Sequence, residues 1–164
     1  MKSFFSFPNP VNDKAARTVA AVVLLEAIAT LASGWYWLTI PLAYGFWART
    51  LAGPRLSPLG WVAMHVIGPR LGERVYVPGP PKRFAQAMGT VMSTGALLFG
   101  LIFGDHTIAD VLLALFIPAA GLESIFGYCV GCRAFALLMR VGIIPADVCR
   151  ECADLSERLG LARG

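Results

Sequence analysis

Four cysteines are the residues of this sequence best suited to chemistry. They form two Cys-x-x-Cys pairs, Cys129/Cys132 and Cys149/Cys152, with sixteen residues between the pairs. Two such pairs at this spacing are typical of zinc or iron sites with four thiolate ligands. A Cys-x-x-Cys pair is also typical of dithiols that exchange disulfides or carry sulfur as a persulfide. A third interpretation, in which the thiols are buried and inert, stays open beside these two.

The surroundings of both pairs are basic. Arg133 follows the first pair and Arg150 lies inside the second. Pro145 predicts the start of a short helix on which Cys149 and Cys152 share one face. Helix N-termini and neighbouring cations lower the pKa of a thiol, which favours a reactive dithiol.

Two glutamates lie inside apolar segments. Glu123 precedes Cys129 by six residues, whereas Glu26 lies in the middle of the first apolar segment. Carboxylates in a membrane are costly and often functional. We expect Glu123 to move the proton that thiol exchange requires, with a packing role as the alternative. For Glu26 we favour a packing role, and a small transporter that uses Glu26 is a further alternative function.

The composition indicates an integral membrane protein. Apolar residues make up 57% and charged residues 15% of the 164 residues, against about 45–50% and about 25% in a typical soluble domain. Four apolar segments approach the roughly 20 residues that a helix needs to cross a bilayer, at 15–33, 35–52, 84–103 and 108–128. The sequence therefore predicts an all-α membrane protein with four transmembrane helices arranged as two hairpins.

The basic residues predict the orientation of these helices. All 14 Lys and Arg lie before the first segment, around the loop between the second and third, or after the fourth. Cytoplasmic loops carry such an excess, so both termini and the central loop are expected in the cytoplasm. The predicted location is the bacterial inner (plasma) membrane, with several crossings and no nucleic-acid partner.

The chain divides into five parts on this reading. They are a cytoplasmic N-terminal segment, the first hairpin, a proline-rich loop, the second hairpin and a cysteine-containing cytoplasmic segment with a short helix, at 1–14, 15–52, 53–83, 84–128 and 129–164. Within the loop, the apolar stretch 59–67 is too short to span and predicts an interfacial or re-entrant segment. Prolines in 77–81 predict extended or turning backbone. Weak similarity at a period of about 70–74 residues suggests parallel tandem repeats.

A run of residues around the first cysteine pair resembles the signature of a known family. The heptad 126–132 has the pattern F-G-[FY]-C-x-G-C, and Leu122-Glu123-Ser124 precedes it. The runs 9–10, 53–58 and 80–86 resemble the same family of small bacterial integral membrane proteins of unknown function. The resemblance covers about residues 9–152, and Cys129 and Cys132 match its motif. It implies four helices, a cytoplasmic cysteine motif, and a thioredoxin-like or sulfurtransferase protein as a partner.

These observations lead to one functional prediction with an alternative. We expect thiol exchange that transfers reducing equivalents or sulfur, with Cys129 and Cys132 as the working pair and Cys149 and Cys152 as a relay or resolving pair. The alternative is a structural or metal-handling site in which the same four cysteines bind zinc or iron.

Overall fold

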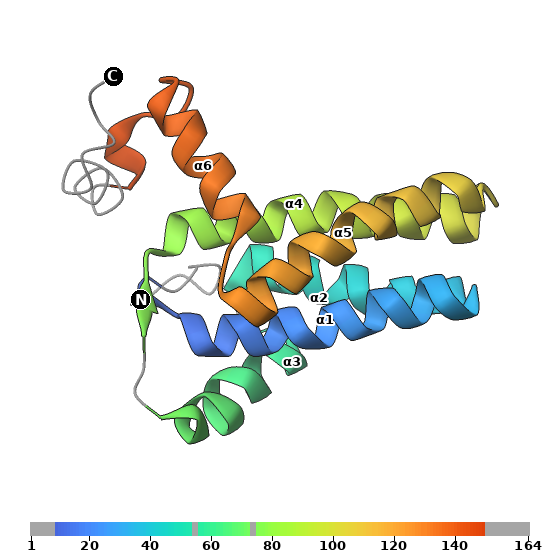
Figure 1. Ribbon diagram of the computed structural model, residues 1–164, viewed down its shortest axis with the longest axis horizontal. Helices are drawn as coiled ribbons and strands as arrows, with labels where there is room; N and C mark the ends of the chain where they lie inside the picture. The colour runs from blue at the N-terminus through green and yellow to red at the C-terminus, as the bar shows by residue number, and fades with distance from the viewer. Residues whose placement is uncertain (1–8, 54–55, 73–74, 150–164) are drawn as a thin grey trace.

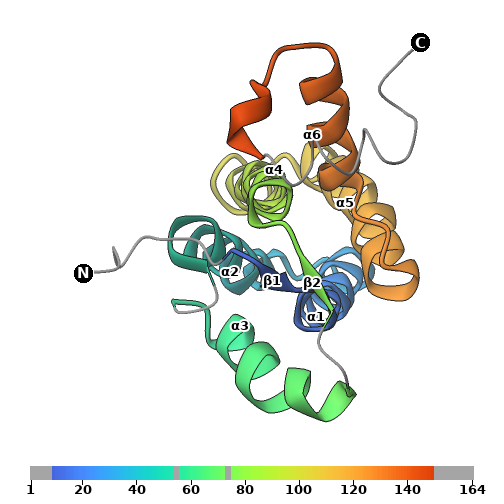
Figure 2. The ribbon, with the colours of Figure 1, turned by 90° about the vertical axis from the view of Figure 1, so that its left-hand side faces the viewer.

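The computed structural model describes residues 9–53, 56–72 and 75–149, and these are mostly helical. Four helical segments run side by side along the long axis of the molecule (Figure 1). They are α1 (Asp13–Ser33), α2 (Thr39–Ala52), α4 (Gly79–Leu97) with its π-helical continuation (Leu98–Ile102), and α5 (His106–Phe126). Seen end-on, the four surround a common centre, while two shorter helices, α3 and α6, lie outside it (Figure 2).

Three of the helical segments are long and apolar enough to cross a membrane. They are Asp13–Ser33, Gly79–Ile102 and His106–Phe126. The predicted segment 35–52 is shorter as a helix, because 3₁₀ turn Tyr36–Leu38 takes its first residues and α2 proper has 14 residues. Large apolar side chains point away from the bundle, for example Leu25, Val91 and Phe126, which are 66%, 74% and 74% exposed. Apolar faces of this kind are compatible with contact with lipid.

The helices pack across the two halves of the sequence. α1 packs chiefly on α5 and α2 packs chiefly on α4, whereas α1 and α2 contact each other little. Leu42 of α2 and Leu113 of α5 are fully buried at the centre. The rings of Phe46 and Phe116 meet edge to face there, with centroids 5.4 Å apart.

A short antiparallel pairing brings the starts of α1 and α4 together. Val11–Asn12 (β1) pairs with Tyr76–Val77 (β2), and the Asp13 N–H donates to the Val75 carbonyl at 2.8 Å. Asn12 caps α1, since its Oδ1 accepts from the Lys14 N–H at 3.1 Å. The first turns of α1 and α4 are therefore held side by side.

The predicted extended stretch 77–81 is wrong for its last three residues. α4 begins at Gly79, and Pro80 and Pro81 occupy its first turn. The first N–H groups of a helix have no partner inside the helix, so proline is tolerated there and its fixed φ suits the helix. The third helix therefore starts five residues before the predicted position and includes Lys82.

The central loop contains a helical stretch that lies against α1. It consists of α3 (Pro58–Val62), a π-helical segment (Ala63–Ile67) and a 3₁₀ turn (Gly68–Leu71). Two of its large apolar side chains, Trp61 and Val66, are 50% and 37% exposed. A short helix in 59–67 is confirmed, and its location at a membrane interface stays a prediction.

Two glycines shape the cysteine segment in different ways. Gly127 ends α5 in the left-handed region at φ 68°, as expected for a tight turn. Gly131 lies inside α6 (Val130–Arg140). A Cβ at Gly131 would lie 2.5 Å from the Cβ of Ala85, so this glycine allows α6 to approach α4 closely.

Gly131→Ala should therefore destabilise the protein by roughly 1–3 kcal/mol, because α6 cannot approach α4 without a shift of backbone. Gly121→Ala is the matched control. It also lies within a helix, but a Cβ there would first meet Leu24 at 4.0 Å. The control should be neutral or up to about 1 kcal/mol more stable. Thermal unfolding in detergent measures both, and equal midpoints for the two variants would contradict the packing argument.

Candidate thiol site

The first cysteine pair lies at the N-terminus of α6. Cys129 is the N-cap residue, and its Sγ accepts a hydrogen bond from the backbone N–H of Cys132 at 3.3 Å. Both cysteines are free thiols, with Cys129 buried at 8% exposure and Cys132 half-buried. A sulfur in this position faces the positive end of the helix dipole, which stabilises a thiolate.

The two thiols differ in acidity. A hydrogen bond from the Cys132 side chain lowers the pKa of Cys129, and the charge of Lys82 lowers it further, against the opposing effects of burial and of Glu123. The pKa of Cys132 is raised, chiefly because its thiol is hydrogen-bonded to Cys129 and secondly because it is buried. The geometry thus makes Cys129 the more acidic thiol of the pair and Cys132 the less acidic one.

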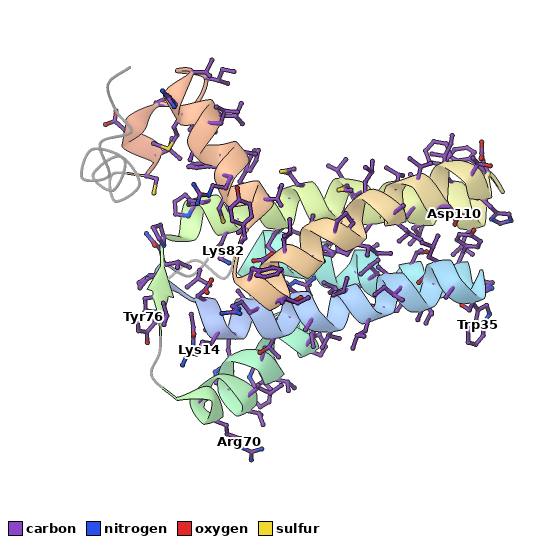
Figure 3. All side chains as sticks on the ribbon, viewed as in Figure 1. Lys14, Trp35, Arg70, Tyr76, Lys82 and Asp110 are labelled. Carbon is purple, nitrogen blue, oxygen red and sulfur yellow. The ribbon has the colours of Figure 1, made fainter. Side chains whose placement is uncertain are left out.

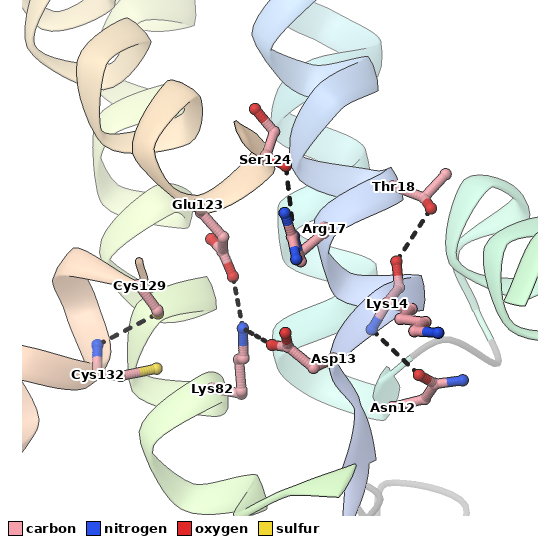
Figure 4. Close-up of polar contacts among 10 residues, drawn as sticks. All are labelled: Asn12, Asp13, Lys14, Arg17, Thr18, Lys82, Glu123, Ser124, Cys129 and Cys132. Carbon is pink, nitrogen blue, oxygen red and sulfur yellow. Dashed lines mark hydrogen bonds and ion pairs between the residues drawn. The ribbon is translucent and has the colours of Figure 1, made fainter. Parts of the chain in front are cut away.

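A buried lysine links the thiol pair to the helix bundle. The Nζ of Lys82 lies 2.8 Å from Oε1 of Glu123 and 3.0 Å from Oδ1 of Asp13. Lys82 is only 5% exposed, and the three residues come from α4, α5 and the start of α1. Figure 4 shows the ammonium between the two carboxylates, with the cysteine pair beside it.

A second basic residue fixes the end of α5 that leads into the site. Arg17 of α1 donates from Nη2 to the carbonyl of Ile125 at 2.7 Å and from Nε to that of Ser124 at 3.4 Å. The last carbonyls of a helix lack partners within the helix, so a guanidinium there both satisfies them and complements the dipole. Arg17 therefore holds the end of α5 on α1, at the two residues that directly follow Glu123.

A cavity of about 80 Å³ adjoins the site. Its wall includes Glu123 from α5, Val130 and Gly131 from α6, and Gln86 from α4, with small apolar side chains of α1 opposite. Glu123 is the carboxylate that lines it. The Glu123 carboxylate therefore faces the cavity and also contacts the ammonium of Lys82.

The structure brings three of the five predicted site residues together. Cys129, Cys132 and Glu123 are electrostatically coupled through Lys82. Cys149 is buried and disulfide-bonded, and Cys152 lies outside the described residues. Among the residues that the structure describes, no group of three or more His, Cys, Asp and Glu is placed to hold a metal ion. The proposed four-thiolate site includes Cys152 and so stays a prediction.

Sequence reasoning missed Lys82 and Asp13. Lys82 enters the sequence analysis only as one of the basic residues that predict the orientation of the helices, because the third helix is expected to begin at residue 84. The available signal was its place directly after Pro80-Pro81, since proline favours the first turn of a helix. Asp13 carried a weaker signal as the residue after an N-cap asparagine, where acidic side chains are favoured.

Comparison with known families matches most of the helical region. Residues 11–140, from the start of β1 to the end of α6, match the domain of unknown function DUF4395. The chain belongs to the DUF4395 family. This confirms the resemblance to a family of uncharacterised proteins, whereas the heptad 126–132 is not tested by the match. No curated protein and no solved structure matches the chain significantly, so the function of this DUF4395 protein has to be argued from its site.

The charges around Cys129 make opposite predictions for two substitutions. Lys82→Gln removes a cation and should raise the pKa of Cys129, so its alkylation by iodoacetamide becomes fast only at higher pH than in the parent. Glu123→Gln removes an anion and should shift the same profile to lower pH. Site-resolved mass spectrometry over a pH series measures both.

Two further variants control this experiment. Lys82→Gln leaves two half-buried carboxylates without their cation, at a cost of up to roughly 3 kcal/mol, whereas Lys82→Arg keeps the charge and should keep the parent profile. Arg83→Gln removes an exposed positive charge at the neighbouring position and should also leave the pH profile of Cys129 alkylation unchanged. Shifts of the same sign in Lys82→Gln and Glu123→Gln would refute the electrostatic account.

Proposed function

We propose that this protein transfers electrons by thiol exchange at the cytoplasmic face of the membrane, with Cys129 and Cys132 as the working pair. The observation that supports this most is the position of the Cys129 sulfur at the N-terminus of α6, hydrogen-bonded by Cys132 and near the Lys82 ammonium. These are the surroundings in which a thiolate is stable and exchanges readily.

The exposure of the two sulfurs suggests the order of bond changes. In the oxidised pair, a thiolate of a partner dithiol attacks the more accessible Cys132 sulfur. The bond between Cys129 and Cys132 breaks, and Cys129 leaves as the thiolate of lower pKa, which makes it the better leaving group. The second partner thiol then attacks the partner sulfur of the mixed disulfide and releases Cys132. The partner is oxidised by two electrons, the pair is reduced, and a second disulfide of another protein or small molecule reoxidises the pair.

Protons move within the buried cluster. The released Cys132 thiolate takes up a proton because the pKa of this thiol is raised. Glu123 lines the adjoining cavity and contacts Lys82, and in this proposal it exchanges a proton with the thiol pair. A thiolate of Cys129 can also attack the outer sulfur of a persulfide on a partner protein, which forms a Cys129 persulfide and releases the partner's thiolate. The partners expected from the family resemblance are a thioredoxin-like or a sulfurtransferase protein. Cys149 and Cys152 form the resolving pair in the proposal.

The proposed orientation places the thiol site in the cytoplasm, with four crossings of the inner membrane by two hairpins. Figure 3 supports it, since Lys14, Arg70 and Lys82 lie at one end of the molecule and Trp35 and Asp110 at the other. Basic residues favour the cytoplasmic side, and tryptophans favour the membrane surface. The 17 residues of turn Tyr36–Leu38 and α2 form the fourth crossing in this arrangement.

Trapping with glutathione disulfide tests the thiol chemistry. In Cys129→Ser the neighbouring thiol that would displace glutathione is absent and the hydrogen bond that raises the pKa of Cys132 is lost, so a glutathione adduct should accumulate on Cys132. In Cys132→Ser the remaining Cys129 is buried, and the adduct should be several-fold less abundant. Intact-mass spectrometry of anaerobically purified protein counts the adducts.

Metal analysis of the same preparations distinguishes the alternative. A zinc or iron site with four thiolates requires all four cysteines, so each of the four single Cys→Ser variants should lose the metal. Stoichiometric zinc or iron in the parent, lost in every variant and without any adduct, would overturn the proposal in favour of a metal-binding protein.

Labelling of single cysteines tests the topology. In a cysteine-free variant, Ser33→Cys and Thr107→Cys should react with a membrane-impermeant maleimide in intact cells, because both residues are exposed at the end opposite the basic residues. Arg70→Cys and Val141→Cys are also exposed and should react only after the cells are permeabilised. Labelling of both Ser33→Cys and Arg70→Cys in intact cells would show that α2 does not cross the membrane, and labelling of Arg70→Cys alone would show the opposite orientation.

A further inference from the structure

A second buried cation lies in the bundle outside the thiol site. Arg49, near the end of α2, is 5% exposed. Its Nε donates to Oε1 of Gln86 at 3.0 Å, its Nη1 donates to Oγ of Ser57 at 3.3 Å, and its guanidinium stacks over the Phe46 ring at 4.6 Å. All three partners are electrically neutral.

The remaining nitrogen of Arg49 has no partner. Its Nη2 is buried, and within the described part of the chain no group accepts a hydrogen bond from it. Within the described residues, Arg49 has no carboxylate within 4.0 Å, whereas Lys82 has two. A buried charge normally has a paired counter-charge, and a guanidinium in a protein does not lose its proton to avoid the cost.

A cavity of about 50 Å³ lies beside this guanidinium. Arg49 and Lys82 both line it, together with the side chains of Gln86 and Asn12, and the rest of its wall is apolar. Because Gln86 accepts from Arg49 through its oxygen, its amide nitrogen remains a donor. The cavity thus combines the guanidinium of Arg49 and two amides with apolar walls, whereas the Lys82 ammonium is already engaged by two carboxylates. The guanidinium is suited to an anion.

We propose that this cavity is a binding site for a small oxyanion, which the free Nη2 of Arg49 holds by charge-assisted hydrogen bonds. Guanidinium groups are well suited to oxyanions, and a desolvated site strengthens the attraction. The anion is either a free inorganic ion or the phosphate of a lipid headgroup. The proposal does not depend on thiol exchange, since none of its residues is a cysteine.

Three carboxylates lie near enough to oppose the anion. Asp13 and Glu123 are occupied by Lys82, which they contact within 3.0 Å. Glu26 of α1 lines a neighbouring cavity together with Arg49 but makes no ion pair with it within 4.0 Å. If Glu26 acts as the counter-charge of Arg49 through solvent, no anion is required, and the experiment has to separate these cases.

Thermal unfolding of the full chain in a phosphate-free maltoside detergent provides the test. Potassium sulfate, nitrate or phosphate replaces potassium gluconate at constant ionic strength. At a concentration about 100-fold above Kd, the oxyanion should raise the Tm by roughly 5–10 °C. Sulfate also stabilises proteins without binding. The rise in Tm must therefore be several-fold smaller in Arg49→Gln than in the parent and keep its full size in Arg70→Gln, which changes an exposed arginine.

Further measurements distinguish a free anion from a lipid phosphate and replace Arg49→Gln if this variant does not fold. Addition of phosphatidylglycerol should reproduce the Arg49-dependent rise if the lipid phosphate is the ligand, and only the free salts should do so otherwise. Glu26→Gln should keep or strengthen the response. If Arg49→Gln does not fold, direct binding to the parent is measured instead. Radiolabelled sulfate or phosphatidylglycerol should then bind saturably. Equal responses in parent and Arg49→Gln, no binding of either ligand, or a response that appears only in Glu26→Gln would overturn the proposal.

Discussion

The ion pairs of Lys82 are the interaction on which the rest of this structure depends. One ammonium, buried in the first turn of α4, contacts carboxylates at the start of α1 and near the end of α5. Desolvation makes a lone buried charge costly, and removal of one partner from such a group is strongly destabilising. Three helices are therefore held in one register at the end of the bundle where α6 begins. The position of Cys129 follows from this register, because only Gly127 and Tyr128 separate it from α5.

The two halves of the chain repeat one arrangement around this point. Arg17 at the start of α1 caps the end of α5, and Arg83 at the start of α4 donates to the carbonyl of Thr50 near the end of α2. In each half a short helix follows, with Ser57 capping α3 as Cys129 caps α6. Such reciprocal contacts are what parallel tandem repeats would produce, and the repeat suggested by the weak period in the sequence stays a prediction. In the caps, a hydroxyl in the first half corresponds to a thiol in the second.

The sequence predicts the long apolar elements and singles out Glu123 as a candidate site residue, but it does not predict the contacts between the helices. Length and composition locate the three long helices, since hydropathy is a property of each segment alone. The pairing of Lys82 with Glu123 depends on how α4 packs on α5. The predicted start of this helix at residue 84 is too late, because proline both breaks a helix in its interior and favours its first turn. The role of Gly131 likewise depends on Ala85 in another helix. Arg49 could not be singled out either, because its burial against Ser57 and Gln86 is a tertiary property.

The buried cluster also explains how a thiolate can form in an apolar setting. Lys82 with Asp13 and Glu123 carries a net charge of one negative unit when both carboxylates are ionised, so a new thiolate at Cys129 would add a second. Adding charge to a poorly solvated cluster is costly, and the Lys82 ammonium offsets part of this cost because it lowers the pKa of Cys129, whereas the charge of Glu123 opposes it. The proposed thiol exchange therefore depends on the same ion pairs that hold α1, α4 and α5 in register.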